Sequence, residues 1–149
     1  EMGMRISADS EGLWVMANKS LNAVDLATLP YPGIATDYKP FLVAMLAVAE
    51  GVGIVTENLF SGRFRYIDEL VRMGADIRTE GHHAVIRGVS ALSGAPVRAH
   101  DIRAGAALVI AALRAEGETE IRDPSHIDRG YESLVENLSR LGAEITRQS

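Results

Sequence analysis

The sequence predicts an α/β protein built from repeated βαβαββ units, with the first helix of each unit inside and the sheets outside. A motif of one hydrophobic residue followed by glycine recurs at Gly3, Gly74 and Gly142, at spacings of 71 and 68 residues. Strand-like and helix-like patterns follow one another in the same order between these copies. Two of the helix patterns are apolar or glycine almost throughout, which is typical of helices buried on every side. Such repetition indicates one supersecondary unit used several times.

Further pieces match between the second and third units in both order and spacing. Thr36-Asp37 corresponds to His100-Asp101. Arg63 and Arg129 each lie 13 residues after the glutamate of an Ala-Glu-Gly sequence. Several matches in a fixed order make chance recurrence a poor explanation. We therefore expect the end of one unit at 1–30, a second unit at 31–99 and a third at 100–149.

The first helix of each unit is predicted from its caps. One helix runs from residue 39 or 40 to 50, with Asp37 as a possible N-cap and Gly51 at its end. Its counterpart is 102–116, with Asp101 as the cap. Both are apolar along most of their length, so we expect them at the centre of the molecule.

The remaining elements follow from alternation, β-branched content and helical spacing. Glycine of the repeated motif ends each second helix, because it takes a left-handed conformation at little cost. The predicted elements are strands 53–57 and 119–122, second helices 65–73 and 128–141, hairpins 4–8 with 13–17 and 76–80 with 83–87, and further strands 24–26 and 97–99.

The composition is that of a globular protein without a dominant charge. Hydrophobic residues make up 47% and charged residues 23%, and the formal charge is −5. Acidic and basic residues are interspersed, which argues against a nucleic-acid or membrane surface. The longest apolar run, 41–49, is too short to span a bilayer. The 149 residues contain no cysteine, which excludes a thiol nucleophile within them and favours a cytoplasmic protein.

Neither a metal nor a cofactor is expected. His82 and His83 are adjacent, and neighbours on a strand point to opposite faces, so we interpret them as hairpin-turn residues rather than metal ligands. The chain begins at Glu1 inside a predicted unit, so we expect it to be part of a longer protein.

The repeat itself predicts where a site would lie. If the units are related by rotation, their first helices start at the same end of the molecule. Helix starts offer free N–H groups and a partial positive charge, which favour anions. Asp37 and Asp101 stand at two such starts, and Arg63 and Arg129 stand just before two second helices. We therefore expect these four side chains around one rim.

Four motifs run nearly from end to end of the chain, and together they are specific. They are His126–Glu132 (HIDRGYE) followed by Leu141-Gly142-Ala143, Leu29–Gly33 with Thr36-Asp37, Thr56-Glu57-Asn58 with Phe60, Arg63 and Phe64, and Asp101–Ala104 before an Ala-rich helix. These motifs resemble the enolpyruvyl transferase family, and specifically its UDP-N-acetylglucosamine 1-carboxyvinyltransferase branch.

The resemblance implies an inside-out α/β barrel, two such domains per full chain, and a site in the cleft between them. The chain would be a partial C-terminal domain, and the missing N-terminal domain would carry a lysine for phosphoenolpyruvate and a mobile loop. The implied reaction transfers enolpyruvyl from phosphoenolpyruvate to the 3-hydroxyl of UDP-N-acetylglucosamine and releases phosphate, which commits the sugar to peptidoglycan.

The two aspartates receive catalytic roles from this resemblance. Asp37 would be the base for the sugar hydroxyl, and its alternative is a helix N-cap. Asp101 would orient the attacking group or hold Arg103, and its alternative is again a cap.

The cations and one apolar residue would bind substrate. Arg63 and Arg103 would bind substrate anions, and Arg129 would bind the phosphate of phosphoenolpyruvate as part of the catalytic set. The alternatives are solvated surface charges and, for Arg129, an ion pair with Asp128 or Asp123. Leu59 would contact the sugar nucleotide through its backbone, or be simply a buried apolar residue.

Two other functions stay open from the sequence. The acceptor would be chosen largely by the missing domain, so another nucleotide or shikimate 3-phosphate is an alternative acceptor. A non-catalytic module of the same fold is the second alternative.

Overall fold

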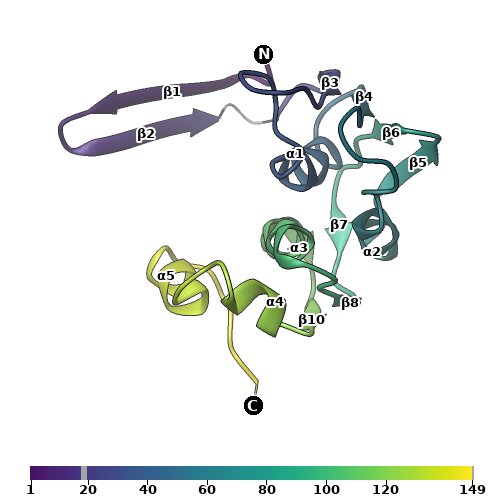
Figure 1. Cartoon of the computed structure of the whole chain (residues 1–149). Coiled ribbons are helices and arrows are strands. Elements are labelled where there is room, and N and C mark those ends of the chain that lie inside the picture. Colours follow the sequence, from purple (N-terminus) through teal and green to yellow (C-terminus); the bar gives the residue numbers. More distant parts are fainter. Residues whose placement is uncertain (18–19, 149) are drawn as a thin grey trace.

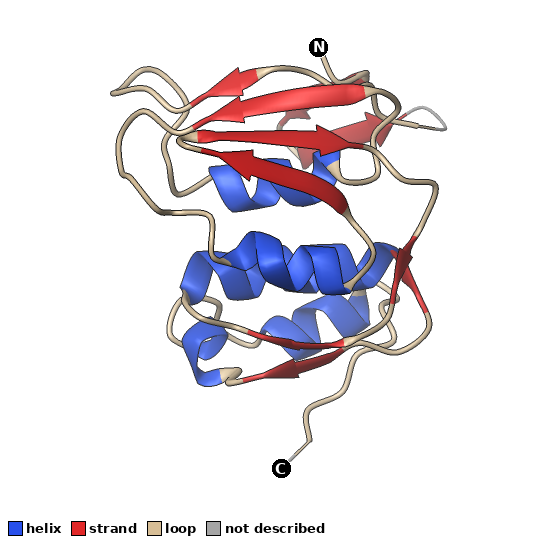
Figure 2. Cartoon of the chain, turned by 90° about the vertical axis from the view of Figure 1, so that its right-hand side faces the viewer, coloured by secondary structure: helices blue, strands red, loops and turns tan. Residues whose placement is uncertain are grey.

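The computed structural model describes residues 1–17 and 20–148. Figure 1 shows α1 (Lys39–Leu46) and α3 (Ile102–Arg114) side by side near the centre of the molecule. In Figure 2 a four-stranded sheet lies above these helices and short strands lie below them. The predicted arrangement, with first helices inside and strands outside, is therefore present in the described residues.

The upper sheet has the strand order β3-β4-β6-β5. Its strands are β3 (Leu26–Ala27), β4 (Val52–Thr56), β5 (Asp76–Glu80) and β6 (His83–Arg87). Both β4 and β5 pair antiparallel with β6, whereas β3 pairs parallel with β4. Val55, Ala84 and Ile86 are fully buried and their neighbours along the strands are more exposed, so one face of the sheet packs on the protein interior. The predicted hairpin 76–80 with 83–87 is confirmed.

The two central helices begin differently. At α3, the Asp101 side chain accepts the N–H groups of Arg103 at 2.8 Å and Ala104 at 3.0 Å, so the predicted cap is confirmed. At α1, the prediction that Asp37 caps the helix is wrong, because the cap position is Tyr38 and no side chain fills it. The N–H groups of Tyr38 and Lys39 instead donate to the carbonyl oxygens of Ala35 and Thr36 in the preceding turn.

The helix predicted over 65–73 is present as α2 (Tyr66–Arg72). Leu70 is fully buried, and Met73 at the C-cap is buried as well. Gly74 follows with a φ of +89°, which confirms the predicted left-handed helix end before β5.

The lower layer consists of short parallel pairs. β7 (Leu92–Ser93) pairs with β9 (Ala115–Glu116), and β8 (Pro96–Arg98) pairs with β10 (Glu120–Arg122). None of the helices in 1–17 and 20–148 is long and apolar enough to cross a membrane.

The prediction of one helix over 128–141 is wrong. The segment forms α4 (Ser125–Asp128) and α5 (Leu134–Arg140), separated by a turn. Ser133 interrupts the helix, because its φ of +49° is left-handed, and Gly130 lies against α3, where a Cβ atom would be 1.8 Å from Cδ1 of Ile102. The chain therefore passes close to α3 at a glycine, which is also a poor helix former.

The hairpin of β1 (Met4–Asp9) and β2 (Gly12–Ala17) confirms the predicted strands but stands away from the body, at the left of Figure 1. Its exposed side chains include Ile6, Leu13 and Val15, which share one face according to the strand register. No sheet closes on itself among the described residues, so the barrel stays a prediction.

Candidate functional site

The starts of α1 and α3 bring together charged side chains from distant parts of the chain. Nη1 of Arg103 donates to Oδ1 of Asp37 at 2.8 Å, and its Nε donates to Oδ1 of Asp101 at 3.3 Å. Nη1 of Arg63 lies 3.7 Å from the same oxygen of Asp37. Two guanidiniums and two carboxylates thus form one cluster at the helix starts. We call Asp37, Arg63, Asp101 and Arg103 the rim cluster.

The Asp101–Arg103 pair is held ionised by its surroundings. Burial alone would raise the pKa of Asp101, but the N–H of Ala104 and the guanidinium of Arg103 outweigh it and leave that pKa lowered. Burial alone would lower the pKa of Arg103, but hydrogen bonds to Asp37 and Asp101 outweigh it, and that pKa is raised. Both residues carry their charges across the physiological range.

Asp37 differs from Asp101 in its access to solvent. Its side chain is 66% exposed, whereas the side chain of Arg103 is 27% exposed. Asp37 therefore presents an open carboxylate that a hydroxyl group of a ligand can reach, while a hydrogen bond from Arg103 holds one of its oxygens.

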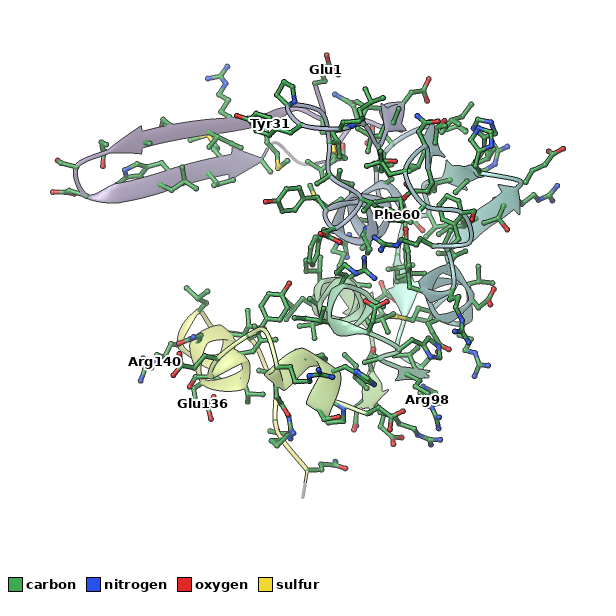
Figure 3. All side chains as sticks on the ribbon, in the orientation of Figure 1. Glu1, Tyr31, Phe60, Arg98, Glu136 and Arg140 are labelled. Carbon is green, nitrogen blue, oxygen red and sulfur yellow. The ribbon has the colours of Figure 1, made fainter. Side chains whose placement is uncertain are left out.

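Arg63 and Leu59 come from the loop between β4 and α2. The guanidinium carbon of Arg63 lies 3.8 Å from the ring centroid of Phe60, which Figure 3 labels near the middle of the molecule. Leu59 is half-buried, and its N–H donates to Oε1 of Glu57 at 2.9 Å. A backbone contact from Leu59 to a ligand is thus left to its carbonyl group.

Arg129, which was expected on the same rim, makes no ion pair with the rim cluster among the described residues. It follows α4 directly, is exposed, and precedes Gly130, which packs against Ile102 at the start of α3. The alternative ion pairs of Arg129 with Asp128 or Asp123 are wrong, because Asp128 pairs with Arg147 and Asp123 pairs with Arg98.

A buried ion pair that was not predicted from the sequence lies next to Arg63 of the cluster. Nζ of Lys39 lies 2.6 Å from Oε2 of Glu57, and each side chain is 1% exposed. Burial alone would raise the pKa of Glu57, but Lys39 and two threonine hydroxyls lower it to about 2. One signal was available: Lys39 is the single charged residue in an otherwise apolar helix, and such a residue needs a partner.

No metal site accompanies these residues. In the described ranges, no group of three or more histidines, cysteines or carboxylates is placed to hold a metal ion. The prediction that His82 and His83 belong to the turn of a hairpin is confirmed, with His82 in the turn and His83 at the start of β6, although their ring centroids are only 4.0 Å apart. His82 precedes β6 in a turn, where strand alternation does not hold.

A separate groove of about 320 Å³, between α2 and the β8–β10 pair, contains none of the rim residues.

The chain is similar to known proteins over nearly its whole length. The family model described as EPSP synthase (3-phosphoshikimate 1-carboxyvinyltransferase) matches residues 1–147. A UDP-N-acetylglucosamine 1-carboxyvinyltransferase of Mycobacterium leprae is 50% identical over 147 residues, covering 99% of this chain and 35% of the relative. Its namesake in Mycobacterium tuberculosis is 57% identical over 125 residues, covering 84% and 30%. The chain therefore spans about a third of the curated relatives it matches.

Two solved structures are similar in fold. The enolpyruvyl transferase NikO from Streptomyces tendae superimposes with a TM-score of 0.87 and 32% identity, covering 97% of this chain and 34% of that one. EPSP synthase from Acinetobacter baumannii gives a TM-score of 0.61 at 23% identity, covering 83% and 30%, which bears on the fold alone.

Proposed function

The chain belongs to the EPSP synthase (3-phosphoshikimate 1-carboxyvinyltransferase) family of enolpyruvyl transferases, and we propose that it is part of an enzyme acting on UDP-N-acetylglucosamine. The reaction transfers enolpyruvyl from phosphoenolpyruvate to the sugar 3-hydroxyl and releases phosphate. The observation that carries this proposal is the identity of about half of all residues, over nearly the whole chain, with relatives named for that acceptor. The rim cluster supports it, because the substrates carry carboxylate and phosphate groups.

The proposed chemistry is addition followed by elimination. The sugar oxygen attacks C2 of phosphoenolpyruvate as C3 takes a proton, and the tetrahedral ketal then loses phosphate together with a C3 proton, which re-forms the double bond of the enolpyruvyl group. Asp37 removes the proton from the sugar hydroxyl. Its support is an exposed carboxylate, one oxygen of which is held at 2.8 Å by Arg103.

The remaining rim groups bind charge. Arg63 and Arg103 neutralise substrate anions, and guanidinium groups suit carboxylates and phosphates because they donate two parallel hydrogen bonds. Asp101 orients Arg103, with which it shares a 3.3 Å contact.

Two further residues contact the substrates in this proposal. Arg129 binds the phosphate of phosphoenolpyruvate from beside the start of α3; its exposed side chain supports this role. Leu59 contacts the sugar nucleotide through its carbonyl, since its N–H is already bonded to Glu57.

The longer protein completes the fold and the site. We place 1–30, 31–99 and 100–149 in three units of a C-terminal inside-out barrel. The exposed apolar face of the β1–β2 hairpin, with Ile6, Leu13 and Val15, supports further chain packing there. The N-terminal domain is the partner that supplies the lysine and the mobile loop. The reaction belongs to peptidoglycan precursor synthesis in the cytoplasm.

The test is made on the full-length protein. Isothermal calorimetry with UDP-N-acetylglucosamine is expected to show binding, and phosphate release from phosphoenolpyruvate is expected only when that acceptor is added. Turnover with shikimate 3-phosphate instead would transfer the proposal to another acceptor. Absence of both binding and turnover would favour a non-catalytic module of the same fold.

A further inference from the structure

The ion pair of Lys39 and Glu57 lies next to Arg63 of the rim cluster and is almost completely buried. Each side chain is 1% exposed, so neither can contact a substrate directly. Removing two charges from water is costly, and a buried ion pair is therefore weak support for stability. The hydrogen bonds of the pair indicate instead that it holds separate segments of the chain together.

Glu57 gathers donors from three separate segments. Its carboxylate accepts the hydroxyl groups of Thr28 and Thr36, each at 2.7 Å. It also accepts the N–H groups of Leu59 at 2.9 Å and Phe60 at 3.1 Å. With the ammonium group of Lys39 added, both oxygens of the carboxylate are fully used. A buried polar network satisfied in this way is rigid.

Lys39 extends the network to the far end of the same loop. Its Nζ donates to the carbonyl oxygen of Arg63 at 2.8 Å and lies 4.1 Å from the ring centroid of Phe64. The loop from 57 to 64 is therefore held at its start by Glu57 and at its end by Lys39.

Three candidate site residues, Asp37, Leu59 and Arg63, belong to this network or lie beside its residues in the sequence. Asp37 stands between Thr36 and Lys39, and both of these bind Glu57. Leu59 donates its own N–H, and Arg63 accepts through its own carbonyl. We propose that Lys39 and Glu57 are positioning residues that hold Asp37, Leu59 and Arg63 in one geometry for the nucleotide sugar. The substrate named here rests on the proposed function.

The test compares variants of the full-length protein by amide hydrogen exchange and by kinetics. Glu57→Gln keeps the volume but leaves Lys39 as a buried charge without a counter-ion. The double variant Lys39→Met with Glu57→Gln removes both charges and covers the case in which the single variant does not fold. Ile86→Val, a fully buried change on β6 outside the network, is the matched control.

We expect faster amide exchange at residues 58–63 in both network variants, with β6 unchanged. We also expect KM for UDP-N-acetylglucosamine to rise roughly 10- to 100-fold, more than kcat falls, because small misplacements of binding groups have effects of this size. Ile86→Val is expected to change neither quantity by more than about twofold.

The outcomes separate the two proposals. Unchanged exchange at 58–63 would overturn the positioning role, whatever the activity. Faster exchange with an unchanged KM, or an equal rise of KM in Ile86→Val, would overturn its link to the substrate. A wild-type protein that turns over no substrate would refute the proposed function alone, and the exchange data would still decide whether the network holds the loop.

Discussion

Nη1 of Arg103 lies 2.8 Å from Oδ1 of Asp37, although the two residues are 66 positions apart in the sequence. The contact joins the starts of α1 and α3, the two helices that the repeat predicts to be equivalent. Because the same guanidinium also contacts Asp101, one arginine fixes two carboxylates. The open carboxylate of Asp37 is thus oriented by a residue of the next unit.

Asp37→Asn in the full-length protein is expected to reduce kcat by about 100-fold or more, because a general base contributes factors of this size. Folding is expected to be unchanged, since the side chain is 66% exposed. Phosphate release at saturating substrate measures the effect, and thermal unfolding checks the fold. Asp68→Asn, an exposed acid on α2, is the control. Near wild-type turnover of Asp37→Asn would remove it as the base.

Arg129→Ala is expected to lose most activity, mainly through a higher KM for phosphoenolpyruvate, because one cation for the phosphate is lost. Its exposed position predicts a normal melting temperature. Arg140→Ala, at the end of α5 and labelled in Figure 3, is the matched surface control. Equal KM values for the two variants would exclude Arg129 from the phosphate site.

Two variants separate the helix-capping role of Asp101 from the role of its charge. Asp101→Ala removes the acceptor of two N–H groups and is expected to destabilise the protein by about 1 kcal/mol. Asp101→Asn keeps a capping oxygen and is expected to retain most of that stability, while weakening the hold on Arg103. Chemical denaturation and kcat/KM are measured on both variants. Equal stability of the two would show that the cap contributes little.

The ion pair at Glu57 predicts that the stability of the folded protein falls at low pH. Its pKa is lowered from 4.5 to about 2 in the folded protein, so the folded state binds the proton less readily than the unfolded state. The stability that this group contributes is complete above about pH 4.5 and is lost as the pH falls toward about 2. The difference in denaturation midpoint between wild type and Glu57→Gln should shrink across that window. A difference independent of pH would contradict the assignment.

A purified protein of residues 1–149 is expected to release no phosphate from phosphoenolpyruvate, because the proposed function assigns a lysine and a mobile loop to a domain outside these residues. The apolar hairpin face, with Ile6, Leu13 and Val15, is expected to bind a hydrophobic dye such as ANS. The triple serine variant at these positions is the control for dye binding. Turnover by the short protein would show that the rim cluster suffices without a second domain.

The sequence located most elements of the fold. The hairpin 76–80 with 83–87, the cap at Asp101 and the turn at Gly74 depend on residues within a few positions of one another. Alternation, capping and left-handed glycine are local properties, so periodicity and spacing are enough to find them. The repeat also indicated that Asp37 and Asp101 lie near equivalent helix starts.

Other features were decided only by tertiary contacts. The helix expected over 128–141 is interrupted between Asp128 and Leu134, where Gly130 packs on Ile102 and Ser133 is left-handed, and no local pattern contains that contact. Lys39 is buried because Glu57, 18 residues later, is brought within 2.6 Å by the strand between them. Local spacing determines which segments become helix or strand. Packing between distant segments determines which charges become buried partners and which stay open for chemistry.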